Sequence, residues 1–87
     1  KAVDYAAVTT CIEQFPTVVS CHDLHIWALS TTDVALTVHV LRDTSTDNDW
    51  FLEKLSQKLR EHYDIAHVTI QVEYGDYQPL RFRDNPY

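Results

Sequence analysis

Histidines and carboxylates are the side chains with the most chemical potential in this 87-residue sequence. Imidazole and carboxylate groups together form a donor set that suits zinc and related first-row divalent ions. The candidate ligands for such an ion are His22, Asp23, His25, His39, His67 and Glu73. The remaining histidine, His62, falls at the end of a predicted helix, where we expect a solvated side chain that favours the helix dipole. No close ligand pair such as C-x-x-C occurs, so spacing along the chain does not by itself identify a metal site.

The positions of these ligands depend on three segments that alternate apolar and polar side chains, as strands with one buried face do. The segments are residues 22–31, 34–42 and 66–74. In each segment most of the aliphatic residues share one face, and the opposite faces together carry His25, His39, His67 and Glu73. His22 and Asp23 stand at the start of the first segment, at the edge of the expected sheet.

Two helices are predicted around these strands. Apolar residues at helical spacing mark the first helix: Tyr5, Val8, Ile12 and Phe15. Asp4 can cap its start, and Pro16 prevents its continuation. The second helix, residues 48–62, follows a polar segment in which Thr46 and Asp49 form a possible capping pair. Its expected core residues are Leu52, Leu55 and Leu59.

The order helix, strand, strand, helix, strand predicts an α+β fold. A short turn joins the first two strands, so they should form an antiparallel hairpin. The helical crossover should then place the third strand parallel to the second, which makes strand 34–42 central. We expect both helices to cover one face of this three-stranded sheet and leave the other face open.

The open face is where the predicted ligands collect. Neighbouring positions on paired strands stand about 5 Å apart at Cβ, which lets side chains from different strands converge on one ion. Polar residues are nevertheless expected on an open sheet face without any metal. Trp27, which projects from this open face, is more typical of a packing or interface residue than of a chemical one. Cys21 fits a buried structural cysteine better than a thiolate ligand.

Composition narrows the functional classes. The formal net charge of -6 disfavours nucleic acid as a partner, since phosphates require a basic surface. No apolar run approaches the length of a membrane span, and Cys11 and Cys21 suit reduced thiols in a cytosolic setting.

The sequence begins with Lys1 and contains no Met, so we expect a piece of a longer protein. We predict one domain over residues 1–74 and an irregular tail over residues 75–87.

Three motifs resemble those of a known family. Residues 22–27 (HDLHIW) resemble the HDLHxW signature that opens the first strand in the C-terminal domains of cation diffusion facilitators. Residues 38–40 (VHV) are similar to the second-strand histidine of that family, and residues 67–73 (HVTIQVE) to its closing HxTIQxE motif. The resemblance covers roughly residues 17–74, with the motifs in the family's order.

This resemblance implies a ferredoxin-like, metallochaperone-like fold and a role in metal sensing. It implies a V-shaped homodimer attached to a transmembrane domain at the cytoplasmic face of the (inner) cell membrane. Zinc, or the related ions Cd²⁺, Co²⁺ and Ni²⁺, would draw the two protomers together and favour efflux. His22 and His39 match family zinc ligands, and Glu73 matches an acidic ligand. Gln71 stands where some members have a histidine, which departs from their complete two-ion site.

Other functions fit the sequence less well. A copper chaperone of this fold class would carry a C-x-x-C loop, and an acylphosphatase-like enzyme would need groups placed for phosphoryl chemistry. The single glycine, Gly75, does not form a phosphate-binding loop. An RNA-recognition domain would have a basic, aromatic sheet. The main alternative is a ferredoxin-like regulatory domain that senses a small molecule without metal; the sequence predicts no enzyme.

Overall fold

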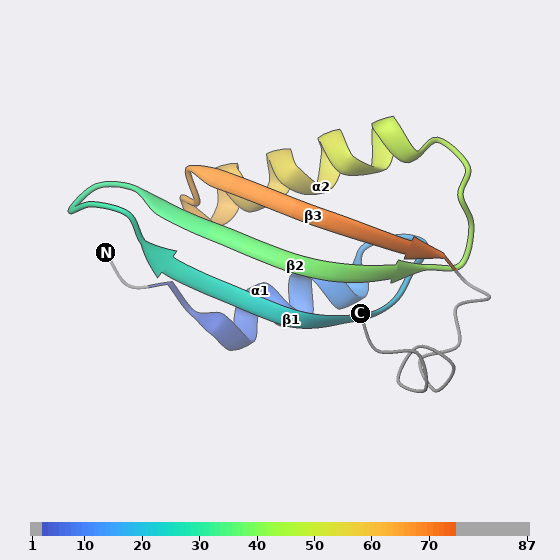
Figure 1. Ribbon diagram of the computed structural model, residues 1–87, viewed down its shortest axis with the longest axis horizontal. Helices are drawn as coiled ribbons and strands as arrows, with labels where there is room; N and C mark the ends of the chain where they lie inside the picture. The colour runs from blue at the N-terminus through green and yellow to red at the C-terminus, as the bar shows by residue number, and fades with distance from the viewer. Residues whose placement is uncertain (1–2, 75–87) are drawn as a thin grey trace, which may run out of the picture.

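A computed structural model describes residues 3–74 and has the predicted order of elements. These are α1 (Tyr5–Gln14), β1 (Val18–Ala28), β2 (Val34–Arg42), α2 (Asn48–Tyr63) and β3 (His67–Tyr74). The strands form one sheet in the order β1-β2-β3, as Figure 1 shows. β1 runs antiparallel to β2, whereas β3 runs parallel to it. The predicted α+β fold with β2 at the centre is therefore confirmed.

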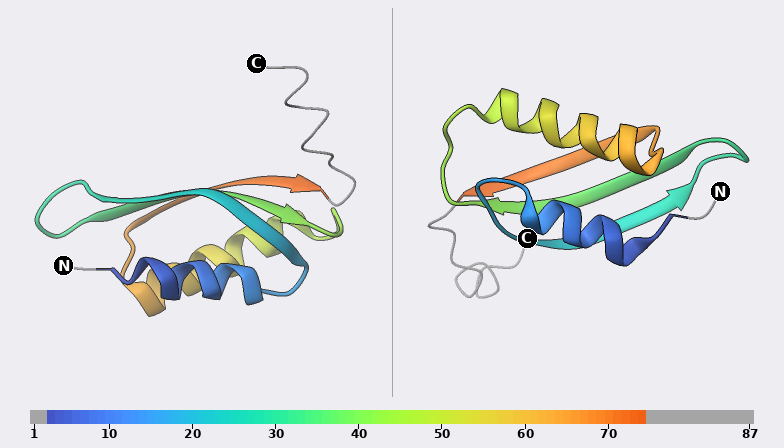
Figure 2. Two further views of the ribbon diagram at one scale, coloured as in Figure 1. Left: turned by 90° about the horizontal axis from the view of Figure 1, so that it is seen from below. Right: turned by 180° about the vertical axis from the view of Figure 1, so that it is seen from behind.

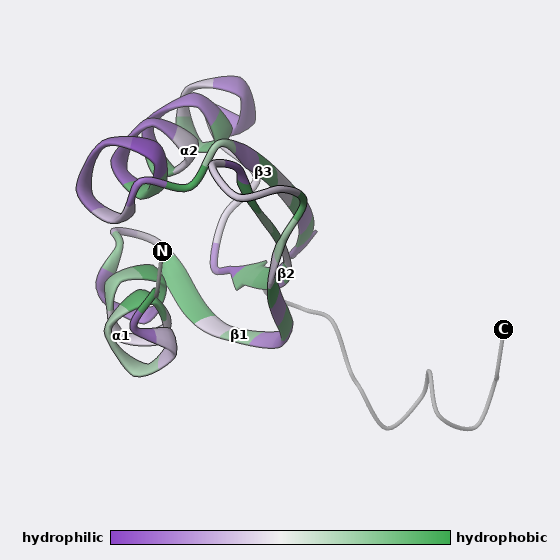
Figure 3. Cartoon of the chain, turned by 90° about the vertical axis from the view of Figure 1, so that its left-hand side faces the viewer, coloured by the Kyte–Doolittle hydropathy of each residue, from purple (hydrophilic) through white to green (hydrophobic). Residues whose placement is uncertain are grey.

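Both helices lie on the same face of the sheet (Figures 2 and 3). The core between the two layers is formed by aliphatic and aromatic side chains from every element. Its fully buried members include Val8, Ile12, Leu36, Val38, Val40, Phe51, Leu55 and Leu59. Burial of this apolar surface drives the folding of so small a domain. Within residues 3–74, no helix covers the opposite face of the sheet, so the described side chains there can meet a ligand or a partner.

The first helix follows the sequence prediction closely. Asp4 caps it, because its carboxylate accepts a hydrogen bond from the backbone N–H of Ala7 at 3.1 Å. Val8 and Ile12 are buried as expected. Tyr5 is half-exposed, and its hydroxyl donates to the carbonyl of Leu24 on β1. Tyr5 thus joins the rim of the helix to the sheet without entering the core.

The start of the second helix differs from the prediction. Asp47 is the residue before α2, has left-handed backbone angles and makes no capping hydrogen bond through its side chain. The predicted capping pair of Thr46 and Asp49 is therefore wrong. The hydroxyl and the N–H of Thr46 bond instead to the hydroxyl of Thr44, and the carbonyl of Thr46 accepts from Arg42.

The buried stripe of α2 is also rotated slightly from the expected one. Phe51, Leu55 and Leu59 are buried, whereas Leu52 is only partly buried beside them. These three residues follow a four-residue spacing and lie on one side of the helix. Phe51, in the first turn of α2, packs its ring edge-on against Phe15, with 5.5 Å between the ring centroids.

The first strand starts earlier and ends sooner than residues 22–31, so that boundary prediction is wrong. β1 begins at Val18, and the hairpin turn takes the last three of the predicted residues. In the turn, the N–H of Leu29 donates to the carbonyl of Asp33 at 2.8 Å. The hydroxyl of Ser30 accepts from the N–H groups of Thr32 and Asp33. These local bonds satisfy backbone groups that a longer strand would have paired.

Residues 75–87 lie outside the described part of the chain, so the predicted irregular tail and the domain boundary at residue 74 stay predictions. Within residues 3–74, no helix is both long and apolar enough to cross a membrane.

Candidate metal site

A bulge in β1 places the first candidate ligands on the open face. His22 pairs with His39, and His25 pairs with Thr37, so two residues of β1 oppose the single residue Val38 of β2. Asp23 takes up the extra length with a φ of 53°, a left-handed value that aspartate tolerates better than most residues. Without the bulge His22 would share a face with Leu24, which is buried in the core. The bulge therefore turns His22 toward the open face while Leu24 still faces the helices.

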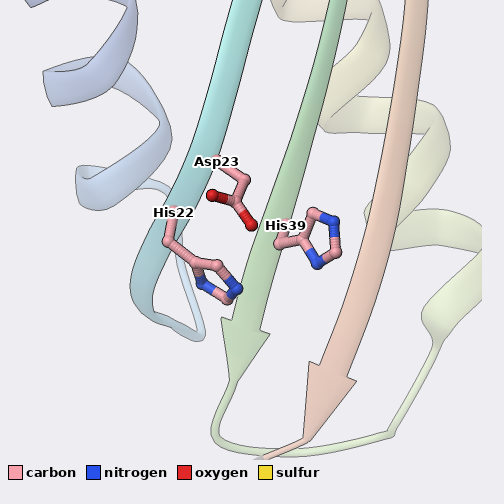
Figure 4. Close-up of side chains that lie close together, drawn as sticks. All are labelled: His22, Asp23 and His39. Carbon is pink, nitrogen blue, oxygen red and sulfur yellow. The ribbon is translucent and has the colours of Figure 1, made fainter. Parts of the chain in front are cut away.

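Three candidate ligand side chains converge beside this bulge (Figure 4). His22, Asp23 and His39 each offer a ligand atom, and these atoms all lie within 4.8 Å of one another. The rings of His22 and His39 are 4.9 Å apart at their centroids. Donors around a tetrahedral zinc ion are about 3.3 Å apart, given bonds near 2.0 Å. Small side-chain rotations would thus bring the three groups onto one ion.

Glu73 approaches the same two histidines from β3. One of its carboxylate oxygens, Oε2, lies 3.0 Å from Nδ1 of His39 and 3.7 Å from Nε2 of His22. The side chain is only 13% exposed, and its other oxygen, Oε1, is buried without a hydrogen-bond partner among the described residues. A buried carboxylate oxygen without a partner is energetically unfavourable. A bound cation would satisfy it, so the residues present fit a metal ion.

The electrostatic character of the site follows from this geometry. Glu73 is nearly buried, while the imidazoles of His22 and His39 remain 46% and 33% exposed. The site is thus closed on the side of β3 and open to solvent on the side of β1. Two imidazoles and two carboxylates supply four donors, which is the usual number for zinc.

The remaining predicted ligands are placed differently. His25 lies next to the group and lines a hollow of about 320 Å³ together with Asp23, Thr37, Val38, His39, Thr69 and Gln71. His67 pairs with Ala35, whereas His39 pairs with Gln71, four residues farther along β3. That separation is about 13 Å along a strand, too far for a shared ion. The structure therefore gathers His22, Asp23 and His39, places Glu73 against the two histidines and His25 beside the group, and leaves His67 apart.

Cys21 is unsuited to the site. It pairs with Val40 and packs against the hydrophobic core. Burial, with a smaller contribution from the charge of Glu13, raises the pKa of the Cys21 thiol above its ordinary value. Metal binding requires the thiolate, which this environment disfavours. The position supports the interpretation of Cys21 as a structural cysteine.

The sequence analysis named every residue of this group but missed the bulge that assembles it. The sequence did contain a signal for the bulge. In a regular strand His22 would share a face with Leu24 and Ile26, which must face the core, although His22 is polar. Only an irregularity between His22 and Leu24 lets the polar and the apolar residues face opposite sides.

Comparisons with known proteins identify the family of this chain. Residues 1–74 match the family described as "Cation efflux protein, cytoplasmic domain". Over 72 residues the chain is 49% identical to the metal cation efflux system protein CzcD of Cupriavidus metallidurans, covering 82% of this chain and 23% of that protein. Over 73 residues it is 36% identical to the human proton-coupled zinc antiporter SLC30A2, covering 84% of this chain and 20% of the antiporter. The chain thus spans less than a quarter of the length of these relatives.

Solved structures extend the comparison to three dimensions. The metal-bound C-terminal domain of the CzcD transporter from Cupriavidus metallidurans superimposes with a TM-score of 0.75 at 49% identity, covering 82% of this chain and 99% of that domain. The metal-bound C-terminal domain of the CzcD transporter from Thermotoga maritima shares the fold, with a TM-score of 0.71 at 24% identity, covering 85% of this chain and 91% of that one. On the match over residues 1–74, this chain belongs to the family of cation efflux protein cytoplasmic domains.

Proposed function

We propose that this chain is the metal-sensing domain of a divalent-cation efflux transporter and that it binds zinc through His22, Asp23, His39 and Glu73. The observation that carries the proposal is the position of Glu73. Its Oε2 lies near both histidines, and its Oε1 is buried without a partner among residues 3–74. Such an arrangement is unfavourable without a cation and favourable with one.

Zinc fits the donor set better than a hard cation does. Two imidazoles favour zinc and related first-row ions, whereas Mg²⁺ and Ca²⁺ prefer oxygen ligands alone. The names of the relatives point the same way, since one is called a zinc antiporter and another a metal cation efflux protein. Cd²⁺, Co²⁺ and Ni²⁺ are the alternative ions for the same ligands.

The domain would act by binding and not by moving ions. We place it at the cytoplasmic face of the (inner) cell membrane, as a part of an integral transporter whose transport path lies in the membrane. We further propose that it is a homodimer and that metal binding favours a closed, transport-active arrangement. Each chain carries a net charge of -6, so two copies repel each other, and a divalent ion near their interface would offset part of that repulsion. His22 and Asp23, on the edge strand β1, are the ligands best placed to link two protomers.

Calorimetric titration with zinc tests the proposed function. The expected result is a saturable heat at a fixed ratio of zinc to chain, with no such heat for Mg²⁺ under the same conditions. A regulatory domain that senses a small molecule without metal would give no stoichiometric heat with zinc. That result would reject zinc sensing in favour of the alternative.

A further inference from the structure

Arg42 is a buried charged residue at the end of β2 where the metal site lies. It is 3% exposed, and all three nitrogens of its guanidinium donate hydrogen bonds. Nε donates to the hydroxyl of Thr17 at 3.1 Å, Nη1 to Oδ1 of Asn48 at 3.2 Å, and Nη2 to the carbonyl of Thr46 at 2.9 Å. The guanidinium carbon lies 4.2 Å from the ring centre of Phe51. One side chain therefore joins the start of β1, the end of β2 and the start of α2.

The contact with Thr17 fixes where β1 begins. Thr17 directly precedes the strand and has a φ of 75°, which is unfavourable for a β-branched residue. Its hydroxyl accepts from Arg42, and its carbonyl accepts from the N–H of Asp43 at 2.9 Å. These two bonds hold the strained residue, and with it the first residue of β1, against the end of β2.

The register of β1 needs such an anchor because the strand is interrupted twice. Its pairing with β2 shifts between Val18 and Ser20 and again between His22 and His25. Only the segment Ser20–His22 keeps regular pairing between the two shifts. A slip of one residue in a strand moves its side chains to the opposite face. The place of His22 opposite His39 therefore depends on a fixed start of β1.

We infer that Arg42 is a positioning residue of the metal site, which holds β1 in the register that brings His22 and Asp23 to His39. The role rests on the proposed zinc binding, and Arg42 would act through the backbone of β1, since its hydrogen bonds go to Thr17, Thr46 and Asn48. Arg42 also pairs with Tyr74 on β3, next to Glu73, so the same anchor stands beside all three strands that supply ligands.

Substitution by lysine tests this role. Arg42→Lys keeps the charge but loses the planar fork that reaches three acceptors. We expect zinc affinity to fall about tenfold or more in calorimetry, at a temperature where the variant is folded. Thr17→Val, which removes one acceptor, should lower affinity about fivefold, and it serves in place of Arg42→Lys if that variant does not fold. The control is Val34→Ala, which removes core packing at the far end of β2.

A second measurement separates positioning from a general loss of stability. In the zinc-free protein, NMR contacts between the ring protons of His22 and His39 report the register directly. They should disappear in Arg42→Lys and persist in Val34→Ala. The inference is overturned if Arg42→Lys keeps both its zinc affinity and the intensities of its His22–His39 ring contacts within twofold of the parent protein. It is also overturned if Val34→Ala loses zinc affinity and ring contacts to the same extent as Arg42→Lys. If the parent protein binds no zinc, the proposed function fails, and the ring contacts alone still decide the role of Arg42.

Discussion

Nδ1 of His39 lies 3.0 Å from Oε2 of Glu73, although 34 positions separate the two residues in the sequence. The parallel pairing of β2 with β3 creates this contact. Because α2 returns the chain to the end of the sheet where β2 starts, β2 and β3 run side by side and also end side by side. Glu73 pairs in register with Leu41, two residues beyond His39, and reaches back to the imidazole. The crossover helix is thus what brings a carboxylate to the histidine, and metal affinity should depend strongly on this pair.

Replacement of His39 should weaken zinc binding most clearly. His39→Ala removes the proposed ligand on the central strand and also the partner of Glu73, so we expect zinc affinity to fall at least tenfold, or about 1.4 kcal/mol. Calorimetric titration measures the change. His62→Ala, which removes an exposed histidine of α2, is the matched control and should bind as the parent protein does. Unchanged titration curves for His39→Ala would exclude this residue from the site.

Asp23 is a proposed ligand and also has an unusual backbone conformation, and two substitutions separate these roles. Asp23→Gly and Asp23→Ala both remove the carboxylate and should lower zinc affinity alike. Glycine adopts the φ of 53° freely, whereas alanine should lower the free energy of unfolding by about 1 kcal/mol relative to glycine. Calorimetry and urea denaturation measure the two effects. If Asp23→Gly binds zinc like the parent protein, the carboxylate is not a ligand and Asp23 serves only the bulge.

The sequence was sufficient to predict the layers of the fold but not the backbone irregularities that complete the site. Val34, Leu36, Val38 and Val40 alternate and are buried as that alternation requires. The alternation conflict at His22 indicates an irregularity in this strand, but its form, a bulge at Asp23, depends on the pairing of β1 with β2. Arg42 was equally hidden, since its three partners come from two loops and a helix start that only tertiary structure brings together.

Zinc binding should depend on pH. Imidazole ligates a cation only in its neutral form, and histidine in short peptides titrates near pH 6.5. We therefore expect affinity to fall steeply as pH decreases from about 7 to about 5.5. Titrations across this range, with zinc in a buffer that does not bind it, measure the effect. A flat profile would shift the binding from the histidines to Glu73 and Asp23.

The stability of the fold should decrease in alkaline solution. The pKa of Cys21 is raised in the folded chain by burial and by Glu13, from an ordinary value of 9.0. The folded state therefore retains a proton that the unfolded state releases, and this stabilisation is complete below pH 9.0 and is lost as pH rises through the folded-state pKa. Thermal denaturation between about pH 8 and 10 measures the loss. In Cys21→Ala the slope above pH 9 should be shallower; an identical slope would contradict the assignment.

Metal binding should change the angle between two protomers without refolding either one. A ligand shifts such an equilibrium only through its higher affinity for one state, so the site must include or adjoin the interface. The half-exposed position of His22 on the edge strand meets this condition, since its imidazole can approach a second chain. Small-angle scattering with and without saturating zinc should show a smaller radius of gyration in the zinc-bound dimer, while circular dichroism stays unchanged. Size-exclusion chromatography with light scattering establishes the dimer independently, and His39→Ala serves as the control that should not contract. A strictly monomeric protein, or a dimer whose scattering profile ignores zinc, would rule out this closure.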